Sequence, residues 1–189
     1  MKVTFTFLVA LLTLISCKAQ EKTSTNTTTQ NTVVSTSELT PQDNNYSGKI
    51  TEEDFKSGNL KEWFTPGYEA YEPEEEIVEK INRNIDEYKI KVFMGIWCSD
   101  SRREIPKLYS LLDKIDYNQD QLEVIAVDRS KTTTQGYEKN YDIQFVPTII
   151  FIDKNGKEIN RFVEFPQETL EEDILNIVTD QPYKNSYAD

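Results

Sequence analysis

Two short apolar stretches separated by a helical pattern constrain this chain most. Residues 90–97 (IKVFMGIW) and 122–127 (LEVIAV) are nearly continuous runs of apolar, β-forming residues, which is typical of strands buried on both faces. Between them, apolar residues at helical spacing predict an amphipathic helix: Ile105, Leu108, Leu112 and Ile115. A helix that connects two buried strands predicts a parallel crossover within one sheet.

The chain on either side of this unit predicts further helices and a hairpin. Five apolar residues before the first strand recur at helical spacing: Ile77, Val78, Ile81, Ile85 and Tyr88. Residues 148–152 and 158–163 flank a turn with Asn155-Gly156 at its centre, so we expect an antiparallel pair. Apolar spacing then predicts a last helix, with Leu170, Ile174, Ile177 and Val178 on one face. The expected fold is α/β, with a central mixed sheet of parallel strands and a C-terminal antiparallel hairpin, flanked by helices.

The first residues form a targeting pattern. Lys2 precedes a mostly apolar run over residues 3–15, which is too short to span a membrane. The run ends in Ser16-Cys17, and this junction resembles the lipobox of bacterial lipoproteins. The resemblance implies that residues 1–16 are a signal peptide, that Cys17 is lipidated, and that acyl chains anchor the protein to a bacterial membrane. The alternative is a secreted protein in which Cys17 merely falls near the cleavage point.

The remaining chain divides into three parts. Residues 17–49 hold the lipidated cysteine and a Thr/Ser/Asn-rich segment without apolar period, which predicts a disordered tether. Residues 50–182 are predicted to form the domain, and its first part is an aromatic lead-in expected to pack on the rest. Residues 183–189 are predicted to be a frayed tail.

Charge and composition exclude several classes of function. The chain of 189 residues has a formal net charge of -12 and no histidine, so nucleic acid is an unsuitable partner and every imidazole-dependent mechanism is excluded. Two cysteines do not suffice for a structural zinc site, and we expect neither a metal nor a cofactor. With Cys17 lipidated, Cys98 is the remaining thiol, so no internal disulfide is expected.

The sequence Trp97-Cys98-Ser99-Asp100-Ser101-Arg102 lies where the first buried strand meets its helix. With this order of elements it resembles the thioredoxin superfamily, over roughly residues 75–180. Trp97-Cys98 stands where that family has Trp-Cys-x-x-Cys, and Arg102, Glu104 and Pro106 are similar to a Cys-Arg-x-Glu-x-Pro run of membrane-anchored, extracytoplasmic thioredoxins. The segment Val146-Pro147-Thr148 stands where the family has its cis-proline.

Three positions depart from the family pattern. Ser101 replaces the second, resolving cysteine, so the motif is CxxS. Asp100 replaces the proline usual in thioredoxin itself, and Val92 stands where the family has a buried acid. A resolving thiol and the acid that deprotonates it are therefore both missing from the expected positions.

The resemblance implies a site built around Cys98. Cys98 would be the nucleophile, with Trp97 beside it and the Ser101 hydroxyl donating to its sulfur, and the orphan amides of the helix N-terminus would stabilise a thiolate. Asp100 opposes the thiolate by its like charge and is grouped with Val146 and Pro147 as a substrate-contacting residue. An alternative role for Ser101 comes from its S-x-x-E pattern with Glu104, which is typical of a helix cap.

These features predict an extracytoplasmic protein that performs monothiol thiol–disulfide exchange, either isomerase-like or through mixed disulfides. Its partner would be a protein with a disulfide or thiol, or a small thiol. The alternative is a redox-inactive thioredoxin-like binding module or scaffold that uses the surface beside Pro147. Lys18 after Cys17 favours, by analogy, the outer membrane facing the periplasm, and leaves the cell surface open. The sequence does not indicate an oligomeric state.

Overall fold

The computed structural model describes residues 40–42 and 45–188. The predicted signal peptide, Cys17 and most of the predicted tether lie outside the described residues. Within the described part of the chain, none of the helices combines the length and the apolar character that a membrane crossing requires.

The strands of the described residues form one mixed sheet in the order β1-β2-β4-β3-β5-β6. Their bounds are β1 Thr40–Gln42, β2 Asn45–Lys49, β3 Tyr88–Met94, β4 Leu122–Ala126, β5 Thr148–Asp153 and β6 Glu158–Val163. Strands β3 and β4 are parallel, and β5 is antiparallel to both β3 and β6. The predicted parallel crossover and the predicted C-terminal hairpin are therefore confirmed.

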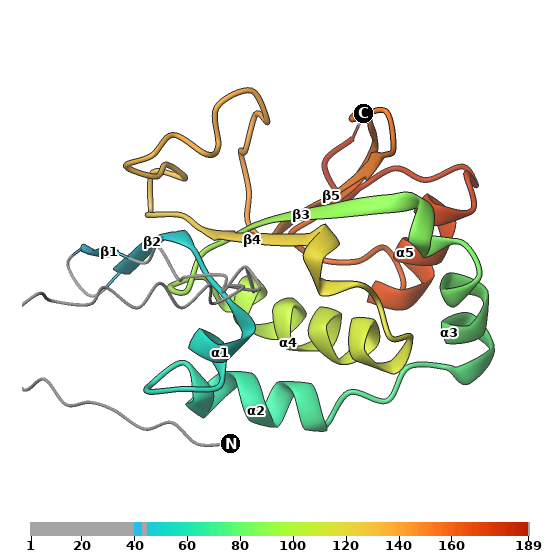
Figure 1. Ribbon diagram of the computed structural model, residues 1–189, viewed down its shortest axis with the longest axis horizontal. Helices are drawn as coiled ribbons and strands as arrows, with labels where there is room; N and C mark the ends of the chain where they lie inside the picture. The colour runs from blue at the N-terminus through green and yellow to red at the C-terminus, as the bar shows by residue number, and fades with distance from the viewer. Residues whose placement is uncertain (1–39, 43–44, 189) are drawn as a thin grey trace, which may run out of the picture. The chain divides into compact units, whose positions relative to one another are not determined.

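The helices of the described residues lie together on one side of the sheet (Figure 1). Their bounds are α1 Glu52–Phe55, α2 Lys61–Glu69, α3 Glu75–Asn82, α4 Ser99–Lys114 and α5 Leu170–Val178. Alternate residues of β3 (Ile90, Val92 and Met94) are buried in the main core with Leu108 and Leu111 of α4. The helix predicted to run to Tyr88 ends at Asn82, because Ile85 lies in a short 3-10 turn and Tyr88 already starts β3.

The opposite side of the sheet faces the long connection between β4 and β5, drawn above the sheet in Figure 1. A second, smaller core cluster lies here, formed by Phe93, Cys98, Ile125, Val127, Val146 and Ile150. Tyr137, Tyr141 and Ile143 of the connection pack against it. Cys98 therefore belongs to the apolar cluster on this side of the sheet and not to the main core.

The structured part of the chain begins earlier than the sequence predicts. The predicted tether extends to residue 49, but residues 45–49 form β2, which pairs with β4 through Gly48 opposite Ala126 and Lys49 opposite Ile125. Backbone pairing with the edge of a sheet needs no apolar period, so the sequence pattern carries no signal for it. Ser47 in this strand is fully buried.

The aromatic lead-in packs on α4, as expected. Phe55 stacks on Phe64 with ring centroids 5.0 Å apart, and Tyr109 of α4 meets both rings at 5.5 Å. Gly67 of α2 lies directly against Pro106, since a Cβ atom at position 67 would be 3.0 Å from the Pro106 Cβ. The absence of a side chain at Gly67 thus permits α2 to approach α4 closely at Pro106.

The C-terminal segment makes defined contacts although the sequence predicts a frayed tail. The Tyr183 hydroxyl donates to the Asp173 carboxylate at 2.9 Å, and its ring packs against the main core. Residues 185–188 continue onto the turn that follows β6, where Ser186 Oγ donates to the Phe165 carbonyl at 2.7 Å.

Candidate functional site

Cys98 is the N-cap residue of α4. Its backbone is extended (φ -89°, ψ 128°), and its carbonyl accepts from the Arg102 amide at 3.1 Å, which starts the helix. The Cys98 amide donates to the Gly95 carbonyl at 2.9 Å, so the loop between β3 and α4 is a tight turn. The free amides of a helix N-terminus carry a partial positive charge that stabilises a nearby anion. Cys98 as a whole residue is 9% exposed.

The loop before β5 meets the thiol. The Val146–Pro147 peptide bond is cis, as the resemblance implies for this position. The Cys98 thiol donates to the Val146 carbonyl oxygen at 3.1 Å. The structure thus brings together Cys98 and the Val146–Pro147 pair, which the family resemblance assigns to one site.

Ser101 has a different partner from either of those expected. Its side chain is completely buried, and its Oγ accepts a hydrogen bond from the Gly95 amide at 3.1 Å. Since α4 begins at Ser99, Ser101 lies inside the first turn and is not the capping residue. The hydroxyl therefore holds the turn that carries Cys98 by satisfying a buried amide of that turn.

Three contacts fix the position of the Trp97 ring. Its indole N–H donates to the Val127 carbonyl at 3.0 Å, and the Arg129 guanidinium lies 5.1 Å from the ring centroid. A Cβ atom at Gly95 would lie 2.7 Å from the ring, so only glycine at this position allows the indole to pack so closely. Trp97 packs against the cluster that contains Cys98, which agrees with the predicted place beside the thiol.

Charged side chains surround the start of α4. Asp100 Oδ2 lies 4.0 Å from the Cys98 sulfur, and the other carboxylate oxygen pairs with Arg103 at 2.7 Å. Arg103 also pairs at 2.5 Å with Glu104, which is fully buried and has Lys107 as a second partner at 3.2 Å. Burial lowers the pKa of Arg103, but hydrogen bonds to Glu104 and Asp100 more than offset this effect and raise it. Arg103 thus reduces the negative field that Asp100 exerts at the sulfur.

Arg102 connects the aromatic lead-in to the site, and the sequence pattern does not predict this connection. Its Nε donates to the Ile96 carbonyl at 2.6 Å, one residue before Trp97. Its guanidinium lies 5.8 Å from the ring of Trp63 in α2. An arginine four residues after a cysteine in a CxxS pattern is the available signal, but nothing in the sequence identifies Trp63 as its partner.

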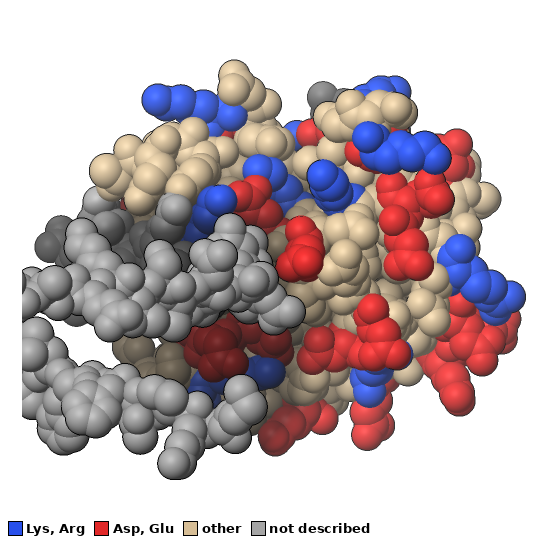
Figure 2. Space-filling model, in the orientation of Figure 1, with Lys and Arg blue, Asp and Glu red and all other residues tan. Residues whose placement is uncertain are grey.

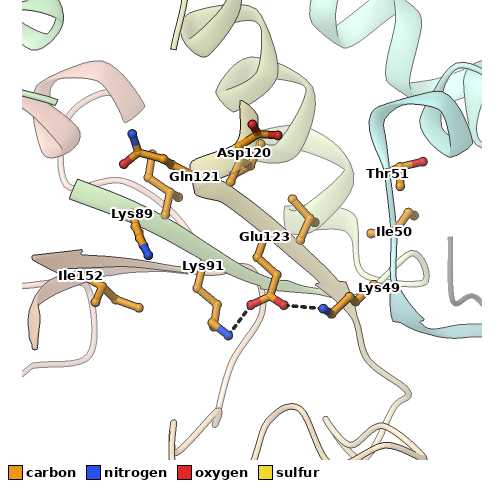
Figure 3. A pocket seen from close by; sticks show the side chains of 12 residues that line it. Lys49, Ile50, Thr51, Lys89, Lys91, Asp120, Gln121, Glu123 and Ile152 are labelled. Carbon is orange, nitrogen blue, oxygen red and sulfur yellow. Dashed lines mark ion pairs between the residues drawn. The ribbon is translucent and has the colours of Figure 1, made fainter. Parts of the chain in front are cut away.

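A separate hollow is lined mainly by residues of β2, β3 and β4 (Figure 3). It has a volume of about 410 Å³, and the residues lining it do not include Cys98. Lys49 and Lys91 both point toward Glu123, which pairs with Lys49 at 3.0 Å and also with Lys91. Lys49 and Lys91 are thus paired with a carboxylate. Because this pairing offsets part of their charge, the hollow does not define an anion-binding site.

The view in Figure 2 shows acidic side chains gathered over the helices. The first turn of α3 carries the exposed residues Glu75 and Glu76, whereas in the first turn of α5 Glu172 is half-buried and Glu171 and Asp173 are buried. The described residues contain no cluster of ligands that could hold a metal ion.

The order of strands, a cysteine at the start of the central helix and a cis-proline loop facing its thiol define a thioredoxin-like fold with a one-cysteine site. The family described as Thioredoxin matches residues 50–176, and the chain belongs to this family. Membership supports a general thiol- or redox-related role. No curated protein matches the chain.

Two solved structures are similar to this chain. One is an HIV epitope scaffold, with 16% identity, a TM-score of 0.49, and coverage of 65% of this chain and 86% of the scaffold. The other is a protein of unknown function from Pseudomonas aeruginosa, with 15% identity and a TM-score of 0.49. That match covers 70% of this chain and 89% of the other.

Proposed function

We propose that this protein performs thiol–disulfide exchange with Cys98 as its single reactive thiol. The observation that carries the proposal is the position of the thiol, which lies between the N-terminus of α4 and the Val146 carbonyl. A thiolate at this position is stabilised by the helix amides, and an extended partner segment can pair with the backbone beside Pro147. Cys98 would be the reacting group, with Trp97 beside it and Ser101 holding its turn through the Gly95 amide, and Val146, Pro147 and Asp100 would contact the partner.

The exchange step has a defined balance. The Cys98 thiol loses its proton, and the thiolate attacks one sulfur of a partner disulfide, which forms a new S–S bond and breaks the old one. The second partner sulfur leaves as a thiolate and takes up a proton. Because Ser101 replaces the resolving cysteine, the mixed disulfide is released by the partner's own second thiol or by a small external thiol. This route favours isomerisation or exchange over net reduction by the protein alone.

The proposed setting is extracytoplasmic. The lipobox-like junction at Cys17 supports a lipid anchor on a bacterial membrane, and the outer membrane facing the periplasm is the proposed location. Protein disulfides persist in that compartment, so it would supply suitable partners.

The test uses the full chain carrying Cys17→Ser in detergent, so that Cys98 is the remaining thiol. An aromatic disulfide reagent should form one stable mixed disulfide per chain, faster with the folded protein than with the same chain in urea. Cys98→Ser is the blank. Absence of a reaction until the protein unfolds would contradict the proposal.

A redox-inactive binding module is the second candidate, and one observation favours it. The Cys98 thiol donates a hydrogen bond to the Val146 carbonyl oxygen, and the Asp100 Oδ2 lies 4.0 Å from the sulfur. The hydrogen bond needs the thiol proton and the carboxylate repels a thiolate, so both contacts stabilise the protonated thiol. Under this alternative, Cys98→Ser would retain full affinity for the physiological partner. Under the proposed function, that substitution would abolish the covalent complex.

A further inference from the structure

Three large aromatic side chains remain exposed near Cys98. Phe145, Phe165 and Tyr187 are 37%, 43% and 44% exposed. Phe145 and Tyr187 stack with centroids 3.8 Å apart and an interplanar angle of 11°, and Phe165 meets Tyr187 edge-on at 6.0 Å. We call Phe145 and Phe165 the aromatic pair; Tyr187 of the C-terminal segment lies in contact with both.

The aromatic pair belongs to the two loops beside the thiol. Phe145 directly precedes Val146, whose carbonyl accepts from Cys98. Phe165 lies in the turn after β6, and the amide of its neighbour Glu164 donates to the Pro147 carbonyl at 2.7 Å. A polypeptide partner that reaches Cys98 along the Val146–Pro147 backbone must therefore pass the aromatic pair.

The C-terminal segment is fixed to this surface by polar contacts as well. Ser186 Oγ donates to the Phe165 carbonyl at 2.7 Å, and the Tyr187 hydroxyl donates to the Glu164 carboxylate. The Tyr187 amide donates to Asn185 Oδ1 at 3.0 Å, so the segment forms a compact turn at this place.

The Tyr187 hydroxyl is bonded to a carboxylate, which affects its ionisation. The hydrogen bond to Glu164, with smaller contributions from burial and from the charges of Glu164 and Asp100, raises the pKa of Tyr187 to about 12.

We propose that the C-terminal segment, residues 185–188, is an intramolecular competitor that occupies the partner-docking surface beside Cys98. It is displaced by a partner segment that supplies an aromatic side chain in place of Tyr187. The proposal deepens the proposed function by naming the class of partner, and it rests on that function for the covalent step.

Physical reasons define the partner. Removal of Tyr187 from the aromatic pair loses a stacked contact, so a partner that brings its own aromatic ring replaces the loss, whereas a small polar segment does not. The Glu164 carboxylate disfavours an acidic residue next to that ring by like charge. The matching partner is an extended segment with an aromatic residue near its cysteine and no adjacent acid.

The first experiment compares thiol access in two truncated chains that carry Cys17→Ser. Deletion of residues 185–189 removes the segment that covers the surface beside Cys98. Deletion of residues 188–189 retains Tyr187 and is the matched control. The first deletion should speed the reaction with an aromatic disulfide reagent about three- to tenfold, the factor expected when one aromatic stack is lost. Alkylation by the much smaller iodoacetamide should change by less than about twofold, and the control should resemble the full chain. Equal rates for both truncations would overturn the proposal.

The second experiment does not depend on a reactive thiol. In a Cys98→Ser chain lacking residues 185–189, the NMR amide signals of Phe145, Glu164 and Phe165 should move from their full-chain positions. A synthetic peptide of residues 183–189 at about millimolar concentration should move them back, and Phe145→Ala should abolish that response. Unmoved signals on deletion would overturn the proposal. If the signals move as expected but Cys98 never reacts, the C-terminal segment does cover this surface and the proposed exchange chemistry is wrong.

Discussion

The Cys98 thiol donates a hydrogen bond to the Val146 carbonyl at 3.1 Å, across 48 positions of the sequence. The loop between β3 and α4 and the loop before β5 are far apart in the sequence, and this hydrogen bond joins them at the sulfur atom proposed to react. Ionisation of the thiol breaks this hydrogen bond, and the helix amides must compensate. The rate of reaction at Cys98 should therefore respond to charges near the sulfur, and Asp100 and Arg103 are suitably placed for a test.

Asp100→Asn should raise the rate of Cys98 alkylation at neutral pH by about three- to tenfold. The substitution removes a carboxylate whose Oδ2 lies 4.0 Å from the sulfur, and so removes a like charge that repels the attacking thiolate. Arg103→Gln is the opposing variant, because it leaves Asp100 without its 2.7 Å partner and should slow the reaction. Both rates are measured with iodoacetamide on the Cys17→Ser chain. Changes of the same sign in the two variants would show that charge at Asp100 does not control the thiol.

Ser101→Ala should destabilise the protein by about 1–3 kcal/mol, since the buried Gly95 amide loses its acceptor. Urea unfolding followed by tryptophan fluorescence measures the change. Ser99→Ala, at the exposed first position of α4, is the control and should change stability far less. If Ser101→Ala left the stability unchanged, another group would have to accept the hydrogen bond of the Gly95 amide.

Ser101→Cys should convert a stable mixed disulfide into a transient one. A second thiol one helical turn from Cys98 can attack the mixed disulfide, form an internal disulfide and release the partner as a thiol. The lifetime of the adduct with the aromatic disulfide reagent, followed by mass spectrometry, reports the change. An adduct as long-lived as that of the parent chain would show that the side chain at position 101 does not reach the sulfur.

Stability should depend on the ionisation of Glu123. Burial raises the pKa of Glu123, but hydrogen bonds from Lys91 and Lys49 more than offset it, so the folded-state pKa lies below the ordinary value. The ion pairs therefore stabilise the fold above the ordinary glutamate pKa, and this contribution is lost as the pH falls through the lowered value. Glu123→Gln should cost less than about 1 kcal/mol at pH 7, because partly exposed pairs are screened. Urea unfolding at pH 7 and pH 3 should show the difference shrinking at low pH, and a constant difference would contradict this origin.

Lipidation should depend on Cys17 alone. A bacterial host expressing the full chain and fed a labelled fatty acid should label the wild type and Cys98→Ser, but not Cys17→Ser. The three chains are compared by gel after membrane extraction. Label retained by Cys17→Ser would contradict the proposed anchor.

The central elements were predictable because their signals are local. Apolar runs and helical spacing encode which faces are buried, so the β3–α4–β4 unit and the β5–β6 hairpin follow from periodicity. The resemblance placed Cys98 at the strand–helix junction and Pro147 in a cis bond, and the structure shows both positions.

By itself, then, the sequence determined the thioredoxin-like order of elements, the single thiol of the domain and the absence of a second cysteine at Ser101. Only the tertiary structure decided that Ser101 serves the Gly95 amide, that β2 joins the sheet, and that Tyr187 lies against Phe145. Such contacts join residues distant in sequence, and they depend on strand order and side-chain direction. A periodic pattern records which face of an element is buried, but it does not record which distant residue covers that face.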